Sequence, residues 1–270
     1  MSDARRTSAE LASAELVARL ERLPFSKWHR HFFILAFCGI ALDAADFAIF
    51  GAALPPVARE FGLGPAQAGL LATVGLVGAF LGALFWGTIS DYIGRRTSFQ
   101  ATVGLFALFT GLVATSWNVL SLSVFRFLSN FGLGGEVPVT LTLSSEYSPG
   151  RIRGAMTGNI MAAFPVGLVL AASLSLLIIP RWGWRALFVV GVVPALLLFF
   201  VRRYMPESAR FLLSKGRIAE AEATVAGIEK DAIGRSLTAD EIKTLTNIHP
   251  EVAAPGKVTA VSYTHLRAHE

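Results

Sequence analysis

Two aspartates stand in the middle of an apolar run that is long enough to cross a lipid bilayer. In the segment GIALDAADFAIFGAALPP, residues 39–56, Asp43 and Asp46 are the charged side chains. At a rise of ~1.5 Å per residue, the run from Phe32 to Leu54 spans roughly 35 Å as a helix, which puts both carboxyl groups near the membrane midplane. Their i, i+3 spacing places them on one face of that helix.

A charged carboxylate at that depth costs at least ~2.5–3.5 kcal/mol, so such residues usually face a partner or a water-filled cavity and mark an ion or substrate path. We therefore interpret Asp43 and Asp46 as the working site, with protons as one of its ligands. The alternative is a pair of protonated, hydrogen-bonded acids that only fastens neighbouring helices together.

A second apolar span brings an arginine to a similar depth. A helix that enters the membrane near Asn118 carries Arg126 about 12 Å into the bilayer, within about a turn of the aspartates. The polar residues of this span share one face of a helical wheel: Arg126, Asn130, Thr140 and Ser144. In a low dielectric, a deprotonated aspartate pairs with Arg126, and protonation frees the guanidinium to bind a substrate carboxylate. The alternative is a static ion pair that fixes packing.

The remaining candidates for chemistry are weaker. Glu136 lies nearer the cytoplasmic end of the same span, where we expect a second proton carrier, part of an inner gate, or a hydrogen-bonding role inside the cell. A membrane-embedded enzyme is the least favoured class, because no nucleophile, base and orienting residue converge in the sequence. We expect no cofactor and no metal, since Cys38 is the one cysteine and the cluster of His265, His269 and Glu270 lies in a tail that we interpret as foreign.

The composition sets the class of protein. Of the 270 residues, 53% are hydrophobic and 16% are charged, and the mean hydropathy is +0.56. These values indicate an all-α, multi-pass membrane protein whose first partner is the lipid bilayer. The net charge of +5 does not indicate nucleic-acid binding, because the arginines fall in short clusters between apolar runs.

Six apolar spans supply the frame for the site. Spans one and four contain the strongly polar residues, and both run on to a proline, Pro55 and Pro138. This pattern favours a 3+3 inverted repeat with its site between the first helix of each triplet. In span two, Gly78 and Gly82 form a small-xxx-small face for close backbone approach. The six predicted spans are 32–57, 66–89, 99–116, 118–146, 154–179 and 184–201.

The chain divides into four predicted regions. A cytoplasmic leader contains a short amphipathic helix over residues 8–23, with leucines on one face and Arg19, Glu21 and Arg22 away from it. Lysine and arginine cluster before span one, between spans two and three, between spans four and five, and after span six. This bias predicts that both ends of the bundle face the cytoplasm from the cell (inner) membrane. The regions are the leader 1–31, the bundle 32–203, a cytoplasmic loop with short helices 204–260, and a non-native tail 261–270.

The loop GTISDYIGRRTS, residues 87–98, resembles the loop between helices two and three of the major facilitator superfamily. It matches the family's Gly-xxx-Asp-(Arg/Lys)-x-Gly-Arg-(Arg/Lys) pattern, with Tyr92 in place of the usual base. The resemblance implies a latch between two halves of a transporter, whereas the loop taken alone is also consistent with a basic turn that only orients the helices. The matching residues are Gly87, Asp91, Gly94, Arg95 and Arg96.

Two further motifs are similar to branches of the same superfamily. The stretch 126–154 resembles helix four and the following loop of the sugar-porter and the aromatic-acid or niacin-type branches, although Asn130 stands where glycine is usual. PESARFL, residues 206–212, resembles the sugar-porter PESPRFL. The resemblance implies a cytoplasmic charge network that locks conformations, made of Asp91, Arg95, Arg96, Glu146, Arg151, Arg153, Glu207 and Arg210.

The resemblance implies the N-terminal half of a proton-coupled symporter that works by alternating access. The expected partners are protons, a small-molecule substrate and a further six-helix half that this chain lacks. The stretch ALDAAD is similar to the DGxD of the aromatic-acid branch, with Ala44 in place of glycine, and it favours a small organic anion such as an aromatic carboxylate. The alternatives are a sugar or polyol symporter, a non-transporting membrane sensor or scaffold, and an inactive fragment.

Overall fold

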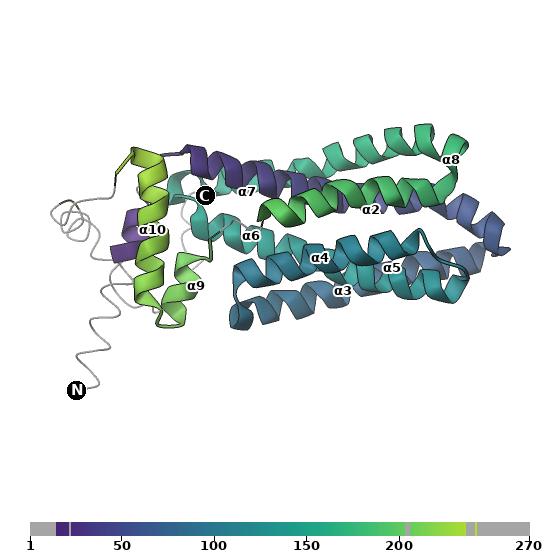
Figure 1. Cartoon of the computed structure of the whole chain (residues 1–270), viewed down its shortest axis with the longest axis horizontal. Coiled ribbons are helices and arrows are strands. Elements are labelled where there is room, and N and C mark those ends of the chain that lie inside the picture. The colour runs from purple at the N-terminus through teal and green to yellow at the C-terminus, as the bar shows by residue number, and fades with distance from the viewer. Residues whose placement is uncertain (1–14, 22, 203–205, 236–240, 242–270) are drawn as a thin grey trace, which may run out of the picture.

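A computed structural model describes residues 15–21, 23–202, 206–235 and 241, and the described part of the chain is helical. Figure 1 shows a long bundle with α10 lying across one end of it. Residues 15–21 form a further short helix. The other helices are α2 (Lys27–Phe61), α3 (Pro65–Ile93), α4 (Arg95–Val113), α5 (Val119–Gly134), α6 (Glu136–Tyr147), α7 (Gly150–Met161), α8 (Ala163–Arg202), α9 (Ala209–Ser214) and α10 (Ile218–Ile233).

The six predicted spans correspond to these helices with two differences. The fourth span is broken at Gly135 into α5 and α6, and the fifth and sixth spans run through α7 and α8, where the chain reverses at Gly183 with φ 76° and ψ 174°. Among the described helices, three stretches are long and apolar enough to cross a membrane by length and composition: Lys27–Phe61, Pro65–Ile93 and Gly150–Leu197.

The first span continues further than the sequence predicted. The helix α2 runs through Pro55 and Pro56 and ends at Phe61, where Gly62 adopts a left-handed conformation with φ 63°. A proline removes one backbone hydrogen bond, but the helix persists because its other side is packed: Ala53 and Val57 are buried in a core shared with α8. The helix therefore extends four residues beyond the predicted apolar span 32–57.

Close backbone contact joins α3 to α5, as the small-xxx-small pattern predicted. A Cβ atom at Gly78 would overlap the carbonyl oxygen of Phe127, and one at Gly82 would overlap that of Phe131. From the other side, a Cβ at Gly134 would overlap the carbonyl oxygen of Ala79. This contact holds the arginine-bearing helix against its neighbour.

We expect Gly82→Ala to lower the free energy of unfolding by about 1–3 kcal/mol, because the added methyl group forces two backbones apart. The matched control is Gly69→Ala on the same helix, where a Cβ would meet no atom within 4 Å. There the better helix propensity of alanine should leave stability unchanged or raise it by up to about 1 kcal/mol. Denaturant titration in detergent measures both, and equal stability of the two variants would contradict the close contact.

The leader helix packs into the protein instead of presenting its charges to water. Its leucines, Leu16 and Leu20, lie in one apolar core with α10 and the start of α2. Arg19 was predicted to point away from the apolar face, and this was wrong: its side chain is 8% exposed and forms a two-point ion pair with the fully buried Glu229 of α10, at 2.8 and 2.7 Å. Residues 1–14, 22, 203–205, 236–240 and 242–270 lie outside the described residues, and these include most of the second half of the predicted loop 204–260 and the whole predicted tail 261–270.

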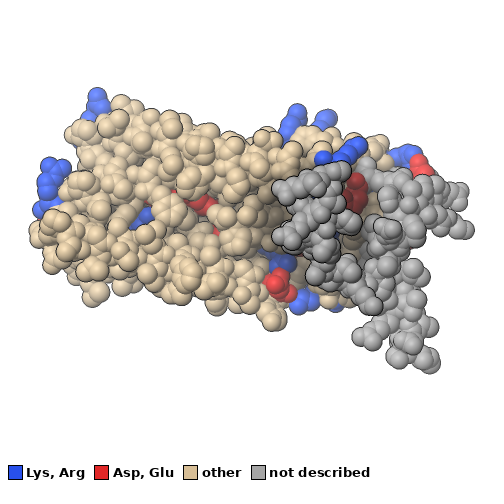
Figure 2. All heavy atoms as spheres, turned by 180° about the vertical axis from the view of Figure 1, so that it is seen from behind, with Lys and Arg blue, Asp and Glu red and all other residues tan. Residues whose placement is uncertain are grey.

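Charge is distributed as a membrane bundle requires. Figure 2 shows basic side chains at one end of the molecule, basic and acidic side chains toward the other end, and a long surface between them that is largely uncharged. A recess in the middle of that surface exposes a few acidic and basic atoms at its bottom. The charged groups inside the bundle are therefore few, and they need partners within the fold.

Candidate functional site

The predicted aspartate and arginine meet inside the bundle. Arg126 of α5 donates from Nη1 to Asp46 Oδ1 of α2 at 2.8 Å, and its Nη2 lies 2.6 Å from Asp46 Oδ2. Both side chains are 2% exposed. One hydrogen bond and a second close ionic contact thus join the guanidinium to both carboxylate oxygens, and the pair neutralises two charges that the membrane interior could not hold separately.

An aromatic ring supports the arginine from the side. The guanidinium carbon of Arg126 lies 4.3 Å from the centre of the Phe50 ring, one helical turn beyond Asp46 on α2. The ring face attracts a cation, and this attraction does not depend on the charge of the aspartate. This contact of Phe50 was not predicted from the sequence.

Asp43 lies one turn before Asp46 and is equally buried, with 2% of its surface exposed. Glu136 is also 2% exposed and sits in the first turn of α6, beyond the break at Gly135. The protein thus buries all four of these ionisable side chains, Asp43, Asp46, Arg126 and Glu136. Of these, Asp46 and Arg126 form the ion pair described above.

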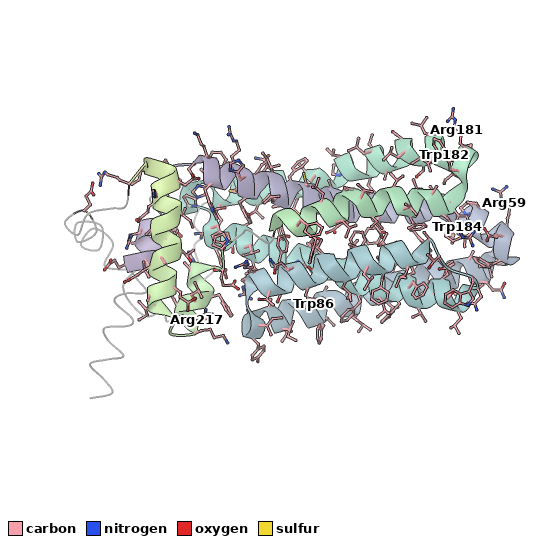
Figure 3. All side chains as sticks on the ribbon, viewed as in Figure 1. Arg59, Trp86, Arg181, Trp182, Trp184 and Arg217 are labelled. Atoms are coloured by element: carbon pink, nitrogen blue, oxygen red, sulfur yellow. The ribbon has the colours of Figure 1, made fainter. Side chains whose placement is uncertain are left out.

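The break between α5 and α6 divides the polar face that the sequence predicted as continuous. Asn130 follows Arg126 by one turn of α5 and is buried, but Ser144 lies on α6, where its hydroxyl is 3.2 Å from that of Thr157 on α7. At the break, Trp86 of α3 donates its ring N–H to the carbonyl oxygen of Phe131 at 3.1 Å (Figure 3). This bond satisfies an acceptor near the end of α5, where the helical ladder stops.

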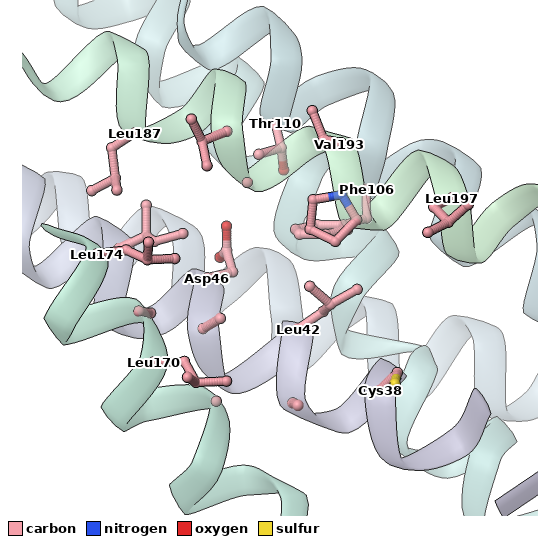
Figure 4. A pocket seen from close by; sticks show the side chains of 18 of the residues that line it. Cys38, Leu42, Asp46, Phe106, Thr110, Leu170, Leu174, Leu187, Val193 and Leu197 are labelled. Carbon is pink, nitrogen blue, oxygen red and sulfur yellow. The ribbon is translucent and has the colours of Figure 1, made fainter. Parts of the chain in front are cut away.

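A cavity of about 650 Å³ opens beside Asp46, between α2, α4 and the two halves of α8. Figure 4 shows the Asp46 carboxyl group pointing into this space among leucine and valine side chains. Thr110, on the α4 wall, is hydrogen-bonded to Ser129 of α5 at 2.7 Å. Because the walls are apolar, the carboxyl group is the main polar feature of the cavity. Cys38 also lines it.

At the α9–α10 end, the loop after α3 forms ionic contacts with α6. Arg95 pairs with Asp91, donates to Ser90 Oγ at 2.8 Å, and lies 3.4 Å from Glu146 Oε1. These contacts tie the end of α3 to the end of α6. The role of Asp91, Arg95 and Glu146 in a conformational lock stays a prediction.

The PESARFL segment caps the same loop. Glu207 Oε1 accepts hydrogen bonds from the backbone N–H groups of Arg96 and Ser208, both at 3.0 Å. Gly94 has φ 103°, and a Cβ there would overlap the Glu207 carboxylate. The glycine is therefore required both by its backbone angle and by its contact, whereas Gly87 has open space around it.

Arg153 and Arg210 converge on Glu21, a leader residue that the sequence did not place in this network. Arg210 Nη2 lies 3.1 Å from Glu21 Oε1, and Arg153 pairs with the same oxygen. Glu21 Oε2 accepts from the backbone N–H of Gly150, the first residue of α7, at 2.5 Å. A carboxylate at a helix N-terminus is favourable. Arg151 is exposed.

We expect Glu21→Gln to speed amide hydrogen exchange in the first turn of α7 while it lowers the free energy of unfolding by only about 0.2–1 kcal/mol, because these ion pairs are partly exposed. Hydrogen exchange with mass spectrometry measures this. The matched control is Glu220→Gln, which removes an exposed carboxylate bonded to Arg217. Equal exchange of α7 in both variants would contradict the role of Glu21.

The opposite end of the bundle has its own carboxylate contact, which the sequence did not reveal. Glu60, near the end of α2, accepts from Trp184 Nε1 at 2.7 Å and from Arg185 at 2.8 Å. Figure 3 places Trp184, with Arg59 and Arg181, at the end far from Arg217. The contact closes the turn at Gly183 onto α2.

Three comparisons bear on this fold and site. Residues 36–246 match the family model described as Major Facilitator Superfamily. The chain is 35% identical over 218 residues to the niacin transporter NiaP of Acinetobacter baylyi, covering 81% of this chain and 50% of that protein. It is 33% identical over 211 residues to the 4-hydroxybenzoate transporter PcaK of the same species, covering 78% and 46%. The chain thus spans about half the length of the curated relatives it matches.

Among solved structures, the proton:xylose symporter XylE superposes with a TM-score of 0.69 at 21% identity, covering 82% of this chain and 52% of that one. At that identity the likeness concerns the fold. The matched half of XylE and the bundle described above share one arrangement of helices. The family and the named relatives are transporters and not enzymes.

Proposed function

The chain belongs to the major facilitator superfamily, and from this premise we propose that it is the N-terminal half of a proton-coupled symporter for a small organic anion. The observation that carries this proposal is the buried two-point pair between Asp46 and Arg126. A carboxylate and a guanidinium at membrane depth hold each other in the charged state. Addition of one proton to Asp46 removes one half of the pair.

The proposed cycle follows from the charges. In the resting state, Asp46 neutralises Arg126. A proton from water neutralises Asp46, and the guanidinium, which stays charged, is then available for the carboxylate of a substrate. The loaded half has no unpaired charge and can rock against a second six-helix half, which exposes the site to the other side of the membrane. Asp43 and Glu136 are proposed as further proton-binding residues on this path.

We propose an aromatic carboxylate as the substrate class. The named relatives with 33–35% identity transport niacin and 4-hydroxybenzoate, and a planar ring that carries one carboxylate is the chemistry that an arginine in an apolar site recognises. The likeness to a xylose symporter is at 21% identity and does not favour sugars as substrates.

The gate residues and the orientation are also proposals. We propose that the contacts of Arg95, Glu207, Arg153 and Arg210 form a latch at the end of the bundle that carries α9 and α10. We also propose that the protein lies in the inner membrane of the cell and that this end faces the cytoplasm. The clustering of arginines supports this orientation. Trypsin should cut after Arg217 in inside-out vesicles and not in right-side-out ones; the reverse result would refute it.

The test of the proposed function uses the complete transporter in liposomes with an acidic exterior. Labelled niacin, 4-hydroxybenzoate and xylose are offered separately. We expect accumulation of a carboxylate above its external concentration, and loss of accumulation when the pH gradient is collapsed. Accumulation of xylose alone would show that the substrate is a sugar and not an aromatic carboxylate. No uptake of any organic acid or sugar would favour a sensor or scaffold that has kept the fold.

A further inference from the structure

Arg126 uses only part of its hydrogen-bonding capacity in the pair with Asp46. The two contacts are made by Nη1 and Nη2, and the buried Nε has no hydrogen-bond acceptor among the described residues. A guanidinium has five N–H donors. The Nε–H donor of Arg126 is therefore unsatisfied where water is scarce. A buried donor without an acceptor costs free energy.

Asn130 has the complementary deficiency. Its side chain is 1% exposed, and its Oδ1 accepts no hydrogen bond from the described part of the chain. Asn130 follows Arg126 by one turn of α5, so both side chains project from the same helix face. An unsatisfied donor and an unsatisfied acceptor thus lie next to each other, although they are not bonded in this arrangement.

Gly75 of α3 shows how close the two side chains are. A Cβ atom at Gly75 would lie 2.6 Å from Asn130 Nδ2 and 3.5 Å from Arg126 Nε. Both polar groups therefore lie over one glycine, so the Nδ2 atom of Asn130 and the Nε atom of Arg126 are at most about 6 Å apart. Any larger residue at position 75 would push Asn130 away.

Phe50 keeps the guanidinium in place during a rotation of its plane. The ring lies 4.3 Å from the guanidinium carbon and attracts the cation whether Asp46 is charged or neutral. The guanidinium plane can turn over the ring face without losing this contact. The pair with Asp46 is the contact that protonation weakens.

We propose that Asn130 is a positioning residue: when Asp46 takes up a proton, Arg126 Nε turns to donate to Asn130 Oδ1, which leaves Nη1 and Nη2 free for a substrate carboxylate. This inference rests on the proposed function and adds the position that the Arg126 guanidinium takes when Asp46 is protonated. The proton comes from water and ends on a carboxyl oxygen of Asp46, and Arg126 keeps its charge throughout. Asn130 thus stabilises the protonated state of the site.

Few other charged groups face Asp46. Arg126 faces it from α5, and Asp43 lies one turn away on α2 itself. Among the described residues that line the cavity, those on α4 and α8 are uncharged, and Cys38 is the one titratable side chain besides Asp46. Glu136 lies farther along, at the start of α6. Few neighbouring groups other than Asn130 could therefore cause a change in the midpoint pH measured for Asp46.

The test is an infrared titration of this chain in lipid nanodiscs. The carboxylic-acid C=O band that disappears in Asp46→Asn is assigned to Asp46, and its midpoint pH is compared between the wild type and Asn130→Leu. We expect the midpoint to fall by about one to two pH units, which is the value of one hydrogen bond to a charged donor. The direction follows because the protonated state loses its acceptor for Arg126.

A purely structural asparagine predicts no shift, and a loss of local polarity alone would raise the midpoint by disfavouring the charged pair. Either result would overturn the proposal. The matched control is Ser129→Ala, which removes a buried polar side chain of the same helix that is bonded to Thr110, and it should leave the midpoint unchanged. If Asn130→Leu does not fold, Asn130→Ser, which is too short to reach Nε, is expected to give the same fall.

Uptake by the complete transporter separates this inference from the proposed function. If the wild type transports nothing, the symporter proposal fails, and the infrared titration still decides the role of Asn130. If the wild type transports, Asn130→Leu should move the pH profile of uptake in the same direction as the band. A changed KM for one substrate with an unchanged pH profile would make Asn130 a substrate contact and refute the positioning role.

Discussion

Replacing Arg126 with leucine should lower the free energy of unfolding by about 3–5 kcal/mol, because it leaves a buried carboxylate without its partner. Asp46 is 2% exposed, and the apolar cavity beside it offers no replacement for the guanidinium. The loss should be larger in alkaline than in acidic buffer, since protonation of Asp46 removes the unpaired charge. Denaturant titration of the purified chain in mild detergent, followed by circular dichroism, measures it.

The double variant Asp46→Leu with Arg126→Leu separates the charge from the shape of the site. Removing both partners should recover most of the lost stability, because no buried charge remains, while transport stays absent. Arg217→Leu, which breaks an exposed ion pair with Glu220, serves as the control and should change stability little. Wild-type stability of the single Arg126→Leu variant at alkaline pH would show that Asp46 does not depend on the arginine.

Asp46→Asn should abolish accumulation of the organic anion in response to a pH gradient and still allow exchange of labelled for unlabelled substrate. Asparagine has the shape of a neutral aspartic acid, so the arginine is permanently released while the proton cannot leave. The site then binds substrate, but the substrate-free transporter cannot return to its first conformation. That return would carry an unpaired, charged Arg126 through the membrane interior. Net uptake and counterflow in the same liposomes measure the two activities.

Glu60→Gln provides the matched carboxylate control. Glu60 lies at the far end of the bundle and bonds to Trp184 and Arg185, away from the membrane interior. This variant should accumulate substrate as the wild type does. Accumulation by Asp46→Asn at the wild-type level would show that the proton is carried elsewhere, with Asp43 as the next residue to replace.

The depth of a residue in a membrane helix could be predicted from the sequence, and this is why the pair of Asp46 and Arg126 could be predicted. A fixed rise per residue and a fixed bilayer thickness place two side chains at one level, and the helical period gives their faces. The close approach at Gly78 and Gly82 followed from the same periodicity. The family motifs then fixed the order of the helices.

Contacts that join distant segments without a periodic signal could not be predicted. Glu21 and Arg19 looked like the solvent side of a short amphipathic helix, but their partners, Arg210 and Glu229, come from α9 and α10, about two hundred residues later. The break at Gly135 was missed although residues 133–138, LGGEVP, carry two glycines, a glutamate and a proline. Trp86 packs where a Cβ at Gly135 would lie, and this tertiary contact requires a glycine at the break.

Proton movement that accompanies substrate entry tests the central claim most directly. The complete transporter is placed in lightly buffered liposomes, and external pH is recorded with an electrode when 4-hydroxybenzoate or niacin is added. We expect the medium to become more alkaline with the wild type, and no change with Asp46→Asn. Substrate entry without proton movement in the wild type, or proton movement that persists in Asp46→Asn, would contradict coupling through Asp46 and Arg126.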